Sequence, residues 1–132
     1  MNDTFTAIAC IDRLSSALMP ARTEGLPFGA YADANGALRV VASAVTVDGL
    51  VREAFDPIRT SCRDNMLMVS RLIDALGRLG LGKDRPGEAE IRRQLELSRA
   101  ELRRSSLAAS DRQALEARMA VVRRDWVGRP LP

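Results

Sequence analysis

Apolar residues recur every three or four positions in five stretches of this chain, the spacing that gathers them on one face of an α-helix. The stretches cover residues 4–19, 47–58, 64–79, 87–104 and 111–126. In the first stretch the predicted apolar face consists of Phe5, Ala7, Ile8, Ile11, Leu14 and Leu18. Asp3 or Thr4 is placed to cap this helix, and Pro20 predicts its end.

Two of the later predicted helices contain residues that indicate where a helix stops or starts. Pro57 lies inside the second apolar pattern and lacks the amide hydrogen that a helix uses, so we expect a kink or an early stop near Phe55. Ser110 and Gln113 have the spacing of a capping box at the start of the last helix. The predicted inner line of that helix is Leu115, Met119, Val122 and Trp126.

A different pattern separates the first two helices. Short β-prone runs around Tyr31 and over residues 38–42 flank the sequence DANG, and its Asn-Gly pair is a strong hairpin signal because both residues tolerate a positive φ. The sequence therefore predicts an all-α, mainly helical fold: about five helices packed as an irregular bundle, with one β-hairpin between helices 1 and 2. Residues 1–127 are expected to form a single soluble helical domain, and residues 128–132 a frayed tail.

Composition agrees with a helical domain and removes several kinds of chemistry. Of the 132 residues, 46% are hydrophobic but only 4% are aromatic, which favours helices packed through Leu, Ile, Val and Ala. The absence of histidine removes the usual general base near neutral pH and the usual imidazole metal ligand. Cys10 and Cys62 are expected to be free, buried or half-buried packing residues. We therefore predict no catalytic residue, no metal site and no cofactor.

The segment GRLGLGKD imitates a phosphate-binding loop. Gly77, Gly82 and Lys83 match the pattern G-x-x-x-x-G-K, but the last position, which needs a hydroxyl group, is Asp84. No strand is predicted before the segment, as such a loop would require. Glycines that end the third helix, Gly80 and Gly82, are the better interpretation.

The predicted fourth helix is rich in arginine. It lies in the second half of the chain, which carries the positive excess behind the net charge of +3. They alternate with glutamates at intrahelical pairing distance, which predicts the pairs Glu88–Arg92, Glu90–Arg93 and Glu96–Arg99. This pattern favours a solvated, salt-bridged face over a nucleic-acid surface. We predict no nucleic-acid partner.

Further charged residues lie on the first two helices. Asp56 is opposite the apolar face of its helix and is expected to be an ordinary exposed acid. Asp12 lies on the flank of the first predicted helix and Arg59 on the flank of the second, and an interhelical ion pair between them is a hypothesis. An alternative function follows from the same residues: Asp12, Asp56 and Arg59 could converge in one cleft, as a small anionic-ligand-binding or enzymatic domain would require.

The motifs NDTFTA, CIDRL, GALRVVA and AFDPIR are similar to those of the bacterial family of predicted membrane proteins called domain of unknown function 2254. The resemblance is to the carboxyl-terminal soluble part of that family, and it runs from Asn2 to about Trp126. It places seven residues on the family motifs: Asn2, Asp3, Thr6, Asp12, Arg13, Asp56 and Arg59. The family supplies no established reaction for them, so the resemblance implies structural or partner-binding roles.

The resemblance also implies a context for the chain. Transmembrane helices precede the Asn-Asp motif in such proteins, so this chain looks like a cut end. We expect the full-length parent in the inner (plasma) membrane with this part in the cytoplasm. An uncovered first helix would favour a homo-oligomer that buries Phe5 and Ile8. The expected function is a non-catalytic assembly, regulatory or partner-binding domain.

Overall fold

The computed structural model describes residues 3–26, 30–41 and 45–128. Within them the elements are α1 (Thr4–Glu24), β1 (Ala30–Ala32), β2 (Leu38–Val41), α2 (Val47–Cys62), α3 (Met66–Leu79), α4 (Glu88–Arg103) and α5 (Ala109–Gly128). The predicted mainly helical fold, with one hairpin between the first two helices, is confirmed. Of the predicted frayed tail, Gly128 is still helical, and residues 129–132 lie outside the described residues.

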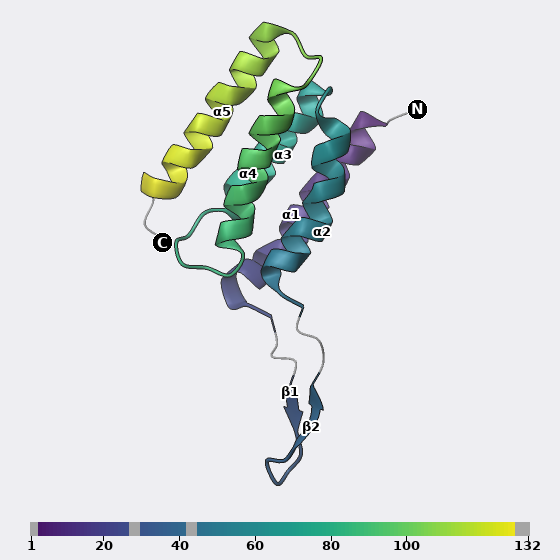
Figure 1. Cartoon of the computed structure of the whole chain (residues 1–132), viewed down its shortest axis with the longest axis vertical. Coiled ribbons are helices and arrows are strands. Elements are labelled where there is room, and N and C mark those ends of the chain that lie inside the picture. The colour runs from purple at the N-terminus through teal and green to yellow at the C-terminus, as the bar shows by residue number, and fades with distance from the viewer. Residues whose placement is uncertain (1–2, 27–29, 42–44, 129–132) are drawn as a thin grey trace.

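The central helix of the bundle is α3. It packs against each of the other four helices, whereas α1 contacts only α2 and α3 among the described elements. Figure 1 shows α1, α3 and α5 running in one direction and α2 and α4 in the other. The inner face of α3 is completely buried and consists of Val69, Leu72, Ile73, Ala75, Leu76 and Leu79. The burial of this apolar stripe fixes the helices that carry the candidate residues around α3.

Both α1 and α2 continue through a proline, so the helix end predicted at Pro20 and the early stop predicted near Phe55 are wrong. α1 passes Pro20 and ends at Glu24, and α2 passes Pro57 and ends at Cys62 rather than near Phe55. Both prolines lie on exposed faces of their helices. The carbonyl group that loses its amide partner at such a position can bond to water, so the helix is not interrupted.

The buried side of α1 differs from the predicted apolar face. Ile11 and Leu18 are buried as expected, but Phe5 is 80% exposed. Two polar residues, Ser15 and Arg22, complete the buried side. The first turn of α1 therefore presents its aromatic side chain to solvent.

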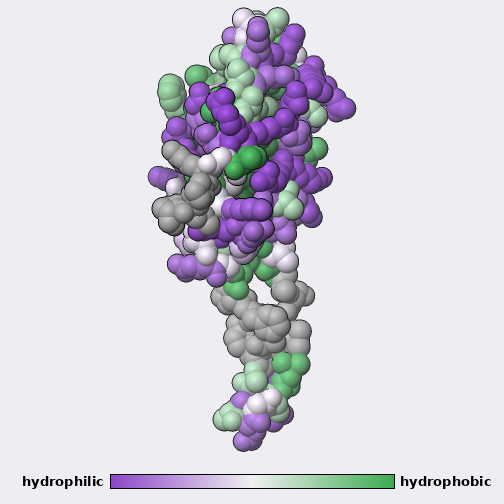
Figure 2. Space-filling view, turned by 90° about the vertical axis from the view of Figure 1, so that its left-hand side faces the viewer, coloured by the Kyte–Doolittle hydropathy of each residue, from purple (hydrophilic) through white to green (hydrophobic). Residues whose placement is uncertain are grey.

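The last helix, α5, starts earlier than predicted. It begins at Ala109, so Ser110 lies inside its first turn and the predicted capping box with Gln113 is wrong. Its buried line agrees with the prediction and consists of Leu115, Met119, Val122 and Trp126. The outer side of the molecule over α5 is mainly hydrophilic (Figure 2).

The predicted hairpin pairs β1 with β2 in antiparallel register, with Tyr31 opposite Val40. Asp33 supports the turn, because its Oδ1 atom accepts a hydrogen bond from the backbone amide of Asn35 at 2.9 Å. Of the Asn-Gly pair, Gly36 alone adopts a positive φ, of 78°. The strands contact none of the described helices, and the hairpin projects from the bundle at the end where α1 stops and α2 begins (Figures 1 and 2).

Candidate functional site

The amino-terminal motif forms a helix cap. The Oδ1 atom of Asp3 accepts hydrogen bonds from the backbone amides of Phe5 (3.1 Å) and Thr6 (3.2 Å), and the Thr6 hydroxyl donates to Oδ2. The hydrogen bonds from Thr6 hold the pKa of Asp3 below its ordinary value. Arg13 is exposed on the outer side of α1, and Asn2 lies outside the described residues. Asp3 and Thr6 therefore satisfy free groups at the start of α1.

Asp12 joins α1 to α3. Arg71 binds both carboxylate oxygens of Asp12, with Nε–Oδ1 and Nη2–Oδ2 distances of 2.6 Å each. Arg78 approaches Oδ1 of Asp12 to 3.6 Å and donates to the Ser15 hydroxyl at 3.5 Å. The hydrogen bond from Arg71 lowers the pKa of Asp12 below its ordinary value. Asp12 is thus an ionised partner of two arginines.

A larger polar network joins α2 to α4 and is centred on the fully buried side chain of Gln94. The Nε2 atom of Gln94 donates to Asp56 Oδ1 at 2.8 Å and to Glu90 Oε1 at 3.0 Å. Its Oε1 atom accepts from Arg59 Nε at 3.2 Å. Arg59 also donates to Asp56 at 3.0 Å and lies 3.5 Å from a carboxylate oxygen of Glu101. These contacts hold the two helices together.

Two carboxylates of this network, those of Glu90 and Asp56, are ionised and paired. Glu90 is 4% exposed and accepts hydrogen bonds from Arg52 at 3.1 Å and from Arg93 at 3.0 Å. Burial acts to raise the pKa of Glu90, but the hydrogen bonds from Gln94 and the two arginines outweigh it, so the pKa is lowered. The hydrogen bond from Gln94 also lowers the pKa of Asp56. Carboxylates in this state do not serve as proton donors near neutral pH.

The structure places three charged motif residues, Asp12, Asp56 and Arg59, in two separate clusters. Asp12 pairs with Arg71, and Arg59 pairs with Asp56, so the expected ion pair between Asp12 and Arg59 is wrong. The periodicity of the sequence indicates on which side of its helix each residue lies, but it does not show that the partner of Asp12 comes from α3. Asp56, expected to be an exposed acid, is half-buried and bonded to Gln94. The alternative function requires Asp12, Asp56 and Arg59 to converge in one cleft. The contacts of Asp12 link it to neither of the other two residues.

Replacement of Gln94 by methionine should lower the free energy of unfolding by about 2 kcal/mol. Methionine has a similar volume, but it leaves Arg59 and Glu90, both buried, without one of their partners. Urea unfolding followed by circular dichroism measures the change. The matched control is Gln113→Met at an exposed position of α5, where we expect a change below about 0.5 kcal/mol. Equal midpoints for the two variants would contradict this role of Gln94.

The ion pairs predicted along α4 are present with one exception, although Glu90 is buried rather than solvated as expected. Two predicted pairs are present at 3.0 Å each, Glu88–Arg92 and Glu90–Arg93. The third is wrong, because Glu96 contacts Arg123 of α5 instead. Arg99 lies 3.6 Å from a carboxylate oxygen of Glu116, also on α5. These charges therefore join α4 to α5.

Arg22 fixes the segment between α3 and α4. Arg22 is 1% exposed, and its guanidinium group donates to the backbone carbonyl oxygens of Leu79 (2.8 Å), Gly82 (3.3 Å), Leu81 (3.5 Å) and Pro86. Gly80 forms the carboxyl-terminal cap of α3, as predicted, and Gly82 follows with a φ of 93°. The segment that imitates a phosphate-binding loop is thus a helix end held by an arginine of α1.

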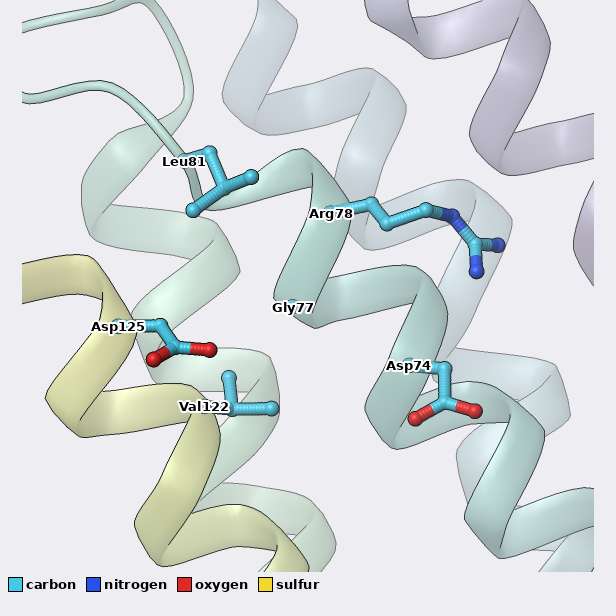
Figure 3. Close-up of a pocket in the computed structure, with 6 residues that line it drawn as sticks. All are labelled: Asp74, Gly77, Arg78, Leu81, Val122 and Asp125. Atoms are coloured by element: carbon cyan, nitrogen blue, oxygen red, sulfur yellow. The ribbon is translucent and has the colours of Figure 1, made fainter. Parts of the chain in front are cut away.

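A pocket of about 270 Å³ lies between α3 and α5 (Figure 3). Its lining consists of Asp74, Gly77, Arg78, Leu81, Val122 and Asp125. Figure 3 shows the Arg78 side chain directed away from Asp125, in agreement with its contacts on α1. Arg118 holds Asp74 in a bidentate pair with two distances of 2.6 Å. None of the six motif residues that the structure describes lines this pocket.

A second cavity, of about 290 Å³, lies between α1, α2 and the start of α3. Its lining is mainly apolar and consists of Ala7, Cys10, Pro57, Ile58, Ser61 and Met68. Nearby, the Asn65 side chain donates to the Thr4 hydroxyl at 3.0 Å, which joins the first turns of α1 and α3. These turns carry the exposed residues Phe5 (80%), Met66 (36%) and Leu67 (60%). We call this cavity and these three residues the apolar end of the bundle.

The two thiol groups should differ in reactivity. Cys10 is exposed, so its expected burial is wrong, whereas Cys62 is buried as expected. Cys10 lies on the flank of α1 that lines the second cavity, where its side chain is open to solvent. Burial raises the pKa of the Cys62 thiol to about 11. Near neutral pH a maleimide should modify Cys10 rapidly and Cys62 only after denaturation, as peptide mass spectrometry would show. Equal rates in the native protein would contradict the described packing.

A family model described as "Predicted membrane protein (DUF2254)" matches residues 1–78 of the chain. The matched segment contains α1, the hairpin, α2 and all but the last residue of α3, and it ends before the expected limit at Trp126. No curated protein and no solved structure matches the chain. None of the described helices combines the length and the apolar character that a membrane span requires.

Proposed function

Since the chain belongs to the DUF2254 family of predicted membrane proteins, we propose that it is a non-catalytic domain through which such a protein assembles with a partner. The observation that carries the proposal is the apolar end, where exposed Phe5 and Leu67 accompany a mainly apolar cavity. Contact between water and such an apolar surface is unfavourable. Exposed apolar patches of this kind therefore mark interaction sites on soluble domains.

The polar motif residues support a role without catalysis. Asp12 and Asp56 are engaged in pairs between helices, and Asp3 caps α1. Arg59 is 9% exposed and bonded within the network of Gln94. Residues used in this way stabilise the fold and hold the apolar end in shape, rather than acting on a substrate.

We place the domain on the cytoplasmic side of the inner membrane. Two free cysteines, one of them exposed, suit a reducing compartment. With Cys10→Ser in the background, a membrane-impermeant maleimide should therefore label Val121→Cys, at an exposed position of α5 away from the apolar end, in permeabilised cells and leave it unlabelled in intact cells. Labelling of intact cells to the same extent would contradict the cytoplasmic assignment.

Photo-crosslinking in native membranes tests assembly directly. A photo-reactive phenylalanine analogue in place of Leu67 should give a specific adduct, because this side chain lies on the proposed contact surface. The matched control carries the same analogue in place of Val121, which is apolar and 43% exposed but lies on α5, away from α1 and α2. We expect an adduct from position 67 and none from position 121. Absence of an adduct from position 67, or the same adduct from both positions, would contradict the proposed function.

A further inference from the structure

The outer side of α1 is the part of the helix that the bundle leaves open. Ile11, Ser15, Leu18 and Arg22 face the core. The opposite side is exposed and includes Thr6, Ala9, Arg13, Ser16 and Pro20. Among the described elements, α1 contacts only α2 and α3, so no helix covers that side. At its first turns this open face continues into the apolar end.

Three exposed charged residues occur along α1 and its amino-terminal cap, and their order is acid, base, acid. Asp3 stands at its start, Arg13 in the middle and Glu24 at its end, and all three are exposed. Asp12, next to Arg13, is already bound by Arg71. Within the described part of the chain, Arg13 pairs with no carboxylate. The helix and its cap therefore offer an exposed acid and an exposed base, about 15 Å apart along the helix axis, for contacts outside the chain.

From these observations we infer that the partner at the apolar end is a second copy of this chain, with the two α1 helices packed antiparallel and Asp3 of each copy paired with Arg13 of the other. The inference rests on the proposed function. Ile8 is a half-buried residue midway between Asp3 and Arg13. In an antiparallel pair of α1 helices centred at Ile8, Asp3 of each copy lies at the same height as Arg13 of the other, which gives two charge pairs. A two-fold axis makes both pairs equivalent and joins like surfaces, so the apolar end of one copy meets that of the other. The same arrangement places Thr6 level with Cys10 of the second copy.

The alternative register of an antiparallel pair leaves the apolar end open. Centred near Leu18, the pair would bring Arg13 level with Glu24 of the second copy. That register satisfies the charges equally well but keeps Phe5 and the cavity in water. Apolar burial supplies most of the affinity of an interface, while exposed ion pairs at the rim set the register. The register centred at Ile8 buries the apolar surface and is the one inferred.

Sedimentation equilibrium of the purified chain tests the inference with variants that preserve the helix. Asp3→Asn keeps a good capping residue and removes the charge, and Arg13→Gln removes the opposite charge. Each should raise the dissociation constant of the dimer about fivefold. The double variant should be no weaker than either single one, because both remove the same contact. Glu24→Gln is the matched control on the same helix and should leave the dimer unchanged.

A second readout reports the register. Thr6→Cys should form an intermolecular disulfide with the native Cys10 under mild oxidation, and addition of Cys10→Ser should abolish it. A chain of 14.4 kDa that stays monomeric up to about 1 mM, additive effects of the two charge variants, or weakening by Glu24→Gln would each overturn the inference. If the purified chain is monomeric while position 67 crosslinks to a different protein, the second copy is excluded and the proposed function stands. Absence of any adduct from position 67 contradicts both.

Discussion

Replacement of Arg22 by methionine should lower the free energy of unfolding by about 3 to 4 kcal/mol, the largest effect that we expect from a single substitution. The guanidinium group is buried and donates to four backbone carbonyl groups at the end of α3 and in the following segment. Methionine fills much of the same space but leaves these oxygen atoms without their donor. It also removes a cation from the carboxyl-terminal end of α3, where the helix dipole favours one.

Arg22→Lys separates the charge of this residue from its geometry. A lysine keeps the positive charge, but a single ammonium group cannot reach carbonyl oxygens that the planar guanidinium contacts from several sides. We expect an intermediate loss, of about 2 kcal/mol, in urea unfolding at neutral pH. A loss below about 1 kcal/mol for the methionine variant would show that Arg22 does not fix the segment between α3 and α4.

Replacement of Gly80 by alanine should cost about 3 kcal/mol, because no space exists for a methyl group at this position. A Cβ atom on Gly80 would lie 2.2 Å from Cε2 of Trp126, so the indole ring would have to move. The ring is 6% exposed, and its Nε1 atom donates to the carbonyl oxygen of Gly77 at 3.0 Å. Arg92 lies over the ring at 5.4 Å from its centre, and that contact would also be lost.

Tryptophan fluorescence reports this change directly, since Trp126 is the single tryptophan of the chain. Gly80→Ala should shift the emission maximum to longer wavelength and lower the urea midpoint. Gly128→Ala is the matched control, because a Cβ atom there meets nothing within 4 Å. The control should leave both readouts unchanged or raise the midpoint slightly. An unchanged emission maximum for Gly80→Ala would contradict the close packing of α5 on α3.

The helices of this protein could be predicted from sequence because their inner faces are apolar and regularly spaced. The buried line of α5 matches the predicted one, and Gly80 ends α3 as expected. Prolines misled the prediction where they lie on exposed faces. Pro20 predicts a helix end, and that hid Arg22, which continues the buried line of Ile11, Ser15 and Leu18 by one further turn.

The candidate site was predictable in its residues but not in its contacts. A sequence shows on which flank Asp12 lies, but not that α3 supplies its partner Arg71. Gln94 was missed, although a signal was present: it stands three residues after Ile91 and next to Leu95, on the buried line of α4. A polar residue on an apolar line indicates a buried hydrogen-bond network, and its partners become known only once the helices are placed.

The state of assembly of the protein in its native cells tests the central proposal, that the apolar end is an assembly surface held in shape by internal charges. The measurement is the size of the complex in detergent-solubilised native membranes for Leu67→Arg, with Val121→Arg as the matched control. Both positions are exposed, so both variants should keep the urea midpoint of the unchanged protein. The account predicts a smaller complex for Leu67→Arg and an unchanged one for Val121→Arg. A Leu67→Arg complex of unchanged size would contradict it.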